Sequence, residues 1–233
     1  MRSFAVICLV AAAIVAGGVA GSARAADECR GIRVCLPVAG PWVVVPRGGV
    51  EYEAVCPRAA PLVAGTDARL AASDIDVSFR GEVGSPVTPG VTTRSSVVFS
   101  AFRLRPAEGI TSFRPFIGCI PTRGGGGRAL TGVTAQRAGI RPTQPLTTVV
   151  VTRRLRFAVA TIRVRCQRGG RLVRSTTAVA FRRSRPPSAS LAASVTMTAR
   201  VVSNVVVARV TATSTATSAG AEAQVRAVCT RAP

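Results

Sequence analysis

Residues 149–166 read VVVTRRLRFAVATIRVRC, and this stretch decides the fold class of the chain. Apolar residues alternate with arginines along it, and a period of two predicts a β-strand rather than a helix. The alternation changes phase near Ala160, which predicts a bulge or bend at that point. The residues expected to face inward are Leu155, Phe157, Val159, Ile162, Val164 and Cys166, and those expected to face outward are Arg154, Arg156, Arg163 and Arg165.

Short runs rich in Val, Ala and Thr, bounded by Gly and Pro, recur on both sides of this stretch. Such runs are typical of strands, and the Gly169-Gly170 and Ser203-Asn204 pairs are turn signals between them. Only the ends of the linker at 121–147 and residues 191–193 suggest short helices. The pattern predicts an all-β chain built of two tandem β-sandwich-like domains or small barrels. The expected strands cover residues 42–45, 50–56, 97–104, 149–164, 172–181, 194–202 and 205–210.

The N-terminal residues have the pattern of a signal peptide. A positive start at Arg2 is followed by an apolar run from Phe4 and then by Ala23-Arg24-Ala25, an Ala-x-Ala cleavage site. We therefore expect residues 1–25 to be removed and the remainder to be secreted, with no transmembrane span after removal. The alternative is an uncleaved membrane anchor, because the apolar run approaches the length of a spanning helix.

Six cysteines remain after residue 25, and an even number in an exported chain favours disulfides over free thiols. A zinc site is disfavoured because the chain has no His and no Cys-x-x-Cys pair. The remaining cysteines are Cys29, Cys35, Cys56, Cys119, Cys166 and Cys229.

An internal repeat selects one pairing of these cysteines. Cys56 and Cys119 are 63 residues apart, and so are Cys166 and Cys229. With a constant offset of 110 residues and no gaps, 11 of the 64 aligned positions are identical, including Leu62 with Leu172. Two similar halves would pair Cys56 with Cys119 and Cys166 with Cys229, and Cys29 and Cys35 would close a small loop.

The repeat divides the chain after the signal into three parts. Residues 26–120 form the first predicted β domain, and residues 148–233 form the second. Residues 121–147 contain Arg-Gly-Gly-Gly-Gly-Arg and three prolines, a composition that predicts a linker. The expected sandwiches resemble those of the immunoglobulin type in architecture alone, since neither half has the Trp that this family places between its paired cysteines.

Positive charge is concentrated in the second half. After residue 25 the chain has 29 arginines and 10 acidic residues, a net charge of +19, and residues 140–233 hold 16 of these arginines against Glu222 alone. Guanidinium groups suit phosphate and carboxylate ligands. One hypothesis is a polyanion-binding surface, and the alternative is a basic surface that only maintains solubility. The proposed surface comprises Arg154, Arg156, Arg163, Arg165, Arg168, Arg171 and Arg174, extended by Arg182, Arg183 and Arg185.

The composition excludes most enzyme classes. Without His or Lys, the chain lacks Ser-His and Cys-His pairs and Schiff-base chemistry. Carboxylates remain, so a secreted hydrolase that uses Glu51, Glu53, Asp74 or Asp76 is the alternative to a non-enzymatic protein. Asp74 and Asp76, with Asp67 and Glu82 nearby, are also a candidate calcium loop. We predict no catalytic, cofactor or metal site, and we expect Asp67 to be a turn residue.

Aromatic residues are too few for two classes of binding protein. Trp42 and Tyr52 are the only Trp and Tyr, and Trp42 is expected in a core rather than on a sugar platform. Phe157 and Phe181 are likewise expected in the core, which disfavours sequence-specific nucleic acid as a partner. The favoured function is a secreted, non-enzymatic protein that binds an anionic cell-wall polymer or an anionic lipid surface through its arginines.

Overall fold

The computed structural model describes residues 27–32, 34–80, 95–104, 110–121 and 146–230, which form an all-β molecule with three disulfides. The all-β class predicted from the period-two pattern is therefore confirmed. The predicted signal peptide and residues 122–145 of the predicted linker lie outside the described residues. Below, the first half denotes residues 27–121 and the second half residues 146–230.

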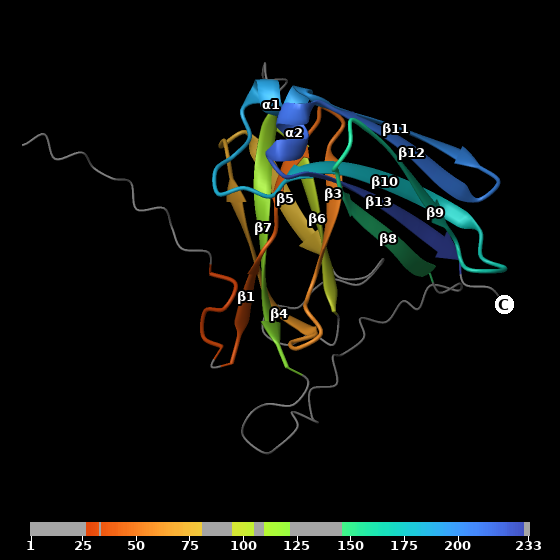
Figure 1. Cartoon of the computed structure of the whole chain (residues 1–233). Helices are drawn as coiled ribbons and strands as arrows, with labels where there is room; N and C mark the ends of the chain where they lie inside the picture. The colour runs from red at the N-terminus through yellow and green to blue at the C-terminus, as the bar shows by residue number, and fades with distance from the viewer. Residues whose placement is uncertain (1–26, 33, 81–94, 105–109, 122–145, 231–233) are drawn as a thin grey trace, which may run out of the picture.

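Most of the described residues lie in strands, which Figure 1 shows in chain order by colour. The first half contains β1 (Leu36–Ala39), β2 (Trp42–Val45), β3 (Val50–Val55), β4 (Leu62–Leu70), β5 (Ile75–Arg80), β6 (Ser96–Arg103) and β7 (Thr111–Ile120). The second half contains β8 (Leu146–Arg154), β9 (Val159–Arg165), β10 (Leu172–Phe181), β11 (Val195–Val202), β12 (Val205–Ala212) and β13 (Ala221–Thr230).

The described strands form three antiparallel sheets. The long sheet has seven strands in the order β1-β7-β2-β10-β13-β8, and β4 also pairs with β7. The other two sheets have three strands each, β3-β6-β5 and β11-β12-β9. Because Val43 of β2 pairs with Ala180 of β10, the long sheet contains strands from both halves of the chain.

Two hydrophobic cores lie between the sheets. One packs Phe99 of β6 against Phe113 and Ile117 of β7 in the first half. The other packs Val206 and Ala208 of β12 against Val225 of β13 in the second half. Trp42 is 1% exposed, so its predicted place in a core is confirmed.

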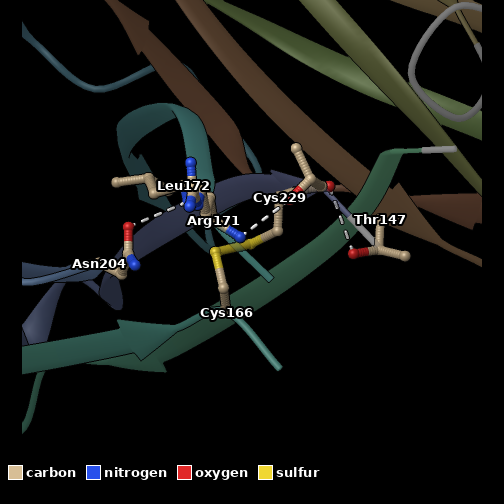
Figure 2. The surroundings of a disulfide bond; sticks show 7 residues. Thr147, Cys166, Arg171, Leu172, Asn204 and Cys229 are labelled. Carbon is tan, nitrogen blue, oxygen red and sulfur yellow. Dashed lines mark hydrogen bonds between the residues drawn. A yellow bond between two sulfur atoms is a disulfide. The ribbon is translucent and has the colours of Figure 1, made fainter. Parts of the chain in front are cut away.

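The three disulfides have the pairing predicted from the repeat, Cys29–Cys35, Cys56–Cys119 and Cys166–Cys229. Each long bridge joins the residue after a strand of a three-stranded sheet to the long sheet, since Cys56 follows β3 and Cys166 follows β9. Figure 2 shows the Cys166–Cys229 bridge. Beside it, the Leu172 N–H donates to Asn204 Oδ1 at 3.3 Å, which ties the β11–β12 turn to the start of β10.

The stretch predicted as one bent strand over residues 149–164 is two strands in different sheets. β8 ends at Arg154 and β9 begins at Val159, so the chain changes sheet at residues 155–158 rather than bulging near Ala160. Leu155 is buried as expected, but Phe157 is 71% exposed, and its predicted place in the core is wrong. The alternation of apolar residues and arginines continues through residues 155–158, where the chain passes from one sheet to the other. The pattern therefore does not show where β8 ends.

The two predicted turns differ in what they connect. Ser203 and Asn204 both have positive φ and join β11 to β12 as a hairpin, as expected. Gly169 also has positive φ, but it sends the chain from β9 to β10, which lie in different sheets. The expected hairpin at Gly169-Gly170 is therefore a connection between sheets.

The second half also contains two short helices, α1 (Ala189–Ala193) and α2 (Ser214–Ser218), and α1 includes the residues predicted as helical. Their N-caps are Ser188 and Thr213, whose hydroxyls accept backbone N–H groups of the first turn. Within the described ranges, no helix has the length and apolar character needed to cross a membrane.

Candidate anion-binding face

The outer face of the β11-β12-β9 sheet carries exposed arginines because the strand period separates apolar from charged residues. On β9, Ile162 and Val164 are buried in the second core, while Arg163 and Arg165 are exposed on the opposite side. This part of the predicted inward and outward assignment is confirmed. The packing of the aliphatic residues therefore fixes the direction of both arginines.

Two further arginines lie on the other strands of the same sheet. Arg200 of β11 and Arg163 of β9 both pair with Val207 of β12, so the three residues form one row across the sheet. Arg209 of β12 lies between Thr198 and Thr161 in the next row. Arg200 and Arg209 are exposed. We name Arg163, Arg165, Arg200 and Arg209 the arginine face.

The strands that carry the arginine face have a net positive charge. The strands of this sheet contain no Asp or Glu, and the single acidic residue of residues 140–233, Glu222, is buried on the long sheet. Within the described part of the chain, none of the four arginines has an ion-pair partner. Four guanidinium groups are therefore available to an anionic ligand.

The other predicted arginines do not share this surface. Arg154 lies at the end of β8 in the long sheet, and Arg156 lies in the crossing between the sheets. Arg168 and Arg171 are exposed around the turn that leads to β10. Arg174 binds Glu51 through both carboxylate oxygens, at 2.9 and 3.0 Å. The expectation that Arg154 and Arg156 share one sheet surface with Arg163 is therefore wrong, because the chain changes sheet between them.

Arg200 and Arg209 were missed by the sequence reasoning. Each is a single arginine in a run of Val, Thr and Ala, so neither belongs to a charge cluster along the chain. The alternation over residues 194–202 and 205–210 predicts that Arg200 and Arg209 both point outward, and this pattern could have identified them as exposed arginines. That they adjoin Arg163 depends on strand order, which local pattern does not specify.

Glu51 and Glu53 are two of the four carboxylates named for a possible hydrolase. They lie close together, and both form ion pairs with arginines. Arg226 of β13 donates to Glu51 at 3.1 Å and to Glu53 at 3.0 Å, and its side chain is 1% exposed. Glu51 also binds Arg80 and Arg174. This group, which we name the carboxylate–arginine cluster, joins the first half of the molecule to the second.

A second buried carboxylate, Glu222, lies next to the cluster on β13. Its carboxylate accepts a hydrogen bond from the Tyr52 hydroxyl at 3.0 Å and pairs with Arg182. Burial raises the pKa of Tyr52 well above its ordinary value, and the negative charge of Glu222 raises it further. The phenol therefore remains a neutral donor to Glu222.

The aspartates of the candidate calcium loop have separate partners. The Asp74 carboxylate lies 4.0 Å from Arg103, and Asp67 accepts the backbone N–H of Asp27 at 2.9 Å. Asp67 and Asp76 line a shallow hollow of about 290 Å³ between β4 and β5. Among the described residues, no three Cys, Asp or Glu side chains are close enough to hold a metal ion, and Glu82 lies outside these residues.

No protein-family model, curated protein or solved structure matches this chain.

Proposed function

We propose that this protein is an exported, non-enzymatic β-protein that binds an anionic polymer of the cell envelope through the arginine face. The observation that carries the proposal is the placement of four exposed arginines on one face of the β11-β12-β9 sheet, with no acidic residue among them. The three disulfides indicate an oxidising environment, as outside the cytoplasm.

The geometry of the face suits a linear polyanion. Residues two apart on a strand, such as Arg163 and Arg165, are about 7 Å apart along it. Arg200 and Arg209 extend the same positive surface across three strands. A guanidinium group offers a planar fork of donors that matches phosphate or carboxylate oxygens. Arginines spaced in this way would contact successive charged groups of one polymer chain.

The finer domain organisation belongs to the same proposal: a signal at residues 1–25, two tandem domains at 26–120 and 148–233, and a linker at 121–147. Strand order supports two related domains. In the second half β8 and β10 flank β13, as β1, β2 and β4 flank β7 in the first. The β9-β12-β11 sheet likewise corresponds to β3-β6-β5, and the offset of 110 superimposes the bounds of β7 and β13.

The repeat also indicates that the arginine face is not a requirement of the fold. With the same offset, Arg163 corresponds to Glu53 and Arg165 corresponds to Val55. Glu53 is half-buried in the carboxylate–arginine cluster, whereas Arg163 is exposed and has no ion-pair partner among the described residues. One sandwich forms without arginines at these positions, so their presence in the other supports a role in binding.

Retention on an immobilised polyanion tests the proposal. The unmodified protein is expected to bind polyphosphate or anionic wall material at low salt and to elute as salt rises. The test variant replaces Arg163, Arg165, Arg200 and Arg209 with Ser. Its control makes the same change in charge on exposed arginines outside the face: Arg168, Arg171, Arg183 and Arg185.

The test variant should elute at a clearly lower salt concentration than the control variant, with both retaining the thermal transition of the parent. Equal elution of the two variants would show that retention depends on total charge alone and would contradict the proposal.

A further inference from the structure

Phe157 is the most exposed large apolar side chain among the described residues, at 71%. It lies in the crossing segment, residues 155–158, which carries the chain from β8 in the long sheet to β9 in the β11-β12-β9 sheet. Single exposed apolar residues are common on protein surfaces and by themselves indicate nothing. Two properties of the surroundings distinguish Phe157: the fixed backbone that presents it and the charge around it.

The crossing segment is held at both ends. At its start, the Leu155 side chain is buried in the second core, and the Leu155 N–H donates to the Ala221 carbonyl at 2.9 Å. At its end, the Ala158 carbonyl accepts the Ala212 N–H at 2.8 Å. The backbone on both sides of Phe157 is therefore fixed, and the ring is left in solvent although the adjacent core takes Leu155.

Three exposed arginines lie close to Phe157 in the sequence. Arg153, Arg154 and Arg156 precede Phe157 and are exposed, and the Arg153 guanidinium is held beside β9 by a 3.1 Å hydrogen bond to the Thr161 carbonyl. Val159, which follows, is 49% exposed. An exposed apolar side chain next to several cations is typical of proteins that bind membrane surfaces. In such proteins the apolar side chain enters the boundary of the acyl chains, and the cations contact anionic headgroups.

We infer that the crossing segment is a docking site for an anionic lipid surface, with the Phe157 ring entering between the headgroups. Arg153, Arg154 and Arg156 contact lipid phosphates at the same depth, and Val159 contributes the adjacent apolar area. Single-stranded nucleic acid is the competing ligand for an aromatic ring among arginines. It fits less well because the exposed neighbours of Phe157 on its C-terminal side are Ala158 and Val159, which offer no second ring for an adjacent base.

Vesicle sedimentation tests this inference on the full protein. Phosphatidylcholine vesicles containing phosphatidylglycerol are expected to bind it, and Phe157→Ser should reduce partitioning about tenfold, the loss expected for one exposed phenylalanine side chain. Phe157→Leu should restore most of the binding. Phe102→Ser is the matched control, because Phe102 is also exposed, at 52%, but lies on β6 in the first half.

Fluorescence gives a second measurement that does not depend on a loss of binding. The chain has one Trp, and Trp42 is 1% exposed, so its emission is a constant background. In Phe157→Trp, the new indole should shift its emission to the blue when anionic vesicles are added. No shift, or equal partitioning of the Phe157→Ser and Phe102→Ser variants, would overturn the inference.

An oligonucleotide arm separates the two ligands. If Phe157→Ser instead abolishes binding to a single-stranded oligonucleotide and leaves vesicle binding unchanged, the site binds nucleic acid and the lipid inference is wrong. Retention on polyphosphate is measured without lipid and tests the arginine face, whereas vesicle binding tests Phe157. A negative result in one assay therefore does not count against the proposal tested by the other.

Discussion

The side-chain amide of Gln224 on β13 hydrogen-bonds to both backbone groups of Glu53 on β3. Gln224 Oε1 accepts the Glu53 N–H at 2.7 Å, and Gln224 Nε2 donates to the Glu53 carbonyl at 3.0 Å. β3 is an edge strand of its sheet, so these groups face away from β6 and pair with no other strand of the described residues. The amide replaces a neighbouring strand at this point and attaches the second half of the molecule to the first.

The flanking residues of β13 extend this attachment along β3. Glu222 binds the Tyr52 hydroxyl, and Arg226 binds Glu51 and Glu53. Glu222, Gln224 and Arg226 are each no more than 2% exposed. The alternate residues of β13, such as Ala223 and Val225, fill the second core. β13 is therefore buried on both faces, one apolar and one polar.

Replacing Gln224 with Leu should destabilise the protein by about 1–3 kcal/mol, because two backbone polar groups of Glu53 lose their partners in a buried site. Urea unfolding followed by circular dichroism measures the change. Gln167→Leu is the control, since Gln167 is exposed before the turn at Gly169, and it should change stability by less than about 0.5 kcal/mol. Equal effects of the two substitutions would contradict the role assigned to Gln224.

Arg226→Met should cost about 3–5 kcal/mol, because it removes a buried cation that serves both Glu51 and Glu53. Arg80 and Arg174 still bind Glu51, so most of the loss is expected to come from Glu53. The double variant Arg226→Met, Glu53→Gln should lose less than the sum of the single variants in a double-mutant cycle. Additive losses would show that this pair is not coupled.

The sequence predicts β2, β3, β6, β10, β11 and β12, but it does not predict β4, β5 or β7 of the first half. The expected strand at 172–181 has the observed bounds, and the offset between the halves gave the disulfide pairing. The expected strands do not include β13, although Ala221, Ala223 and Val225 alternate with Glu222, Gln224 and Arg226 in the period-two pattern of a strand; what this pattern does not predict is that the polar face is buried. The polar face is buried only because β3 approaches it, which is a tertiary relationship.

The candidate sites show the same division. The outward direction of Arg163 and Arg165 follows from the period of β9. That Arg174 is bound to Glu51, 123 residues away in the sequence, depends on how the halves meet. Phe157 was assigned to the core because its phase matches that of Leu155, and only the sheet crossing leaves it exposed.

Tyr52 should make stability depend on pH in alkaline solution. Burial raises the pKa of Tyr52 in the folded protein above the unfolded value near 10, so the unfolded chain loses the phenolic proton first. Its contribution to stability is fully present below about pH 10 and falls by about 1.4 kcal/mol per pH unit as pH rises further.

Urea unfolding at several alkaline pH values measures this slope. Tyr52→Phe is the matched variant, because Tyr52 is the only Tyr in the chain and its absorbance titration reports this residue alone. The variant should be less stable near neutral pH, through loss of the bond to Glu222, and should lack the Tyr52 slope. An unchanged slope in the variant, or titration of Tyr52 near pH 10 before unfolding, would contradict the assignment.

Removing Cys166 and Cys229 together, by substitution with Ala, should destabilise the protein more than removing Cys29 and Cys35. The first bridge spans 63 residues and the second spans 6. The chain-entropy model therefore gives about 4 kcal/mol for the long loop and about 2 kcal/mol for the short one. The long bridge also joins the end of β9 to β13, so its loss removes the disulfide link between the long sheet and the β11-β12-β9 sheet, which carries the arginine face. Unfolding midpoints and retention on polyphosphate should therefore fall together in Cys166→Ala, Cys229→Ala, whereas Cys29→Ala, Cys35→Ala should lower the midpoint slightly and leave retention unchanged. Equal losses of stability in the two double variants would show that native contacts around Cys29 and Cys35 outweigh loop length.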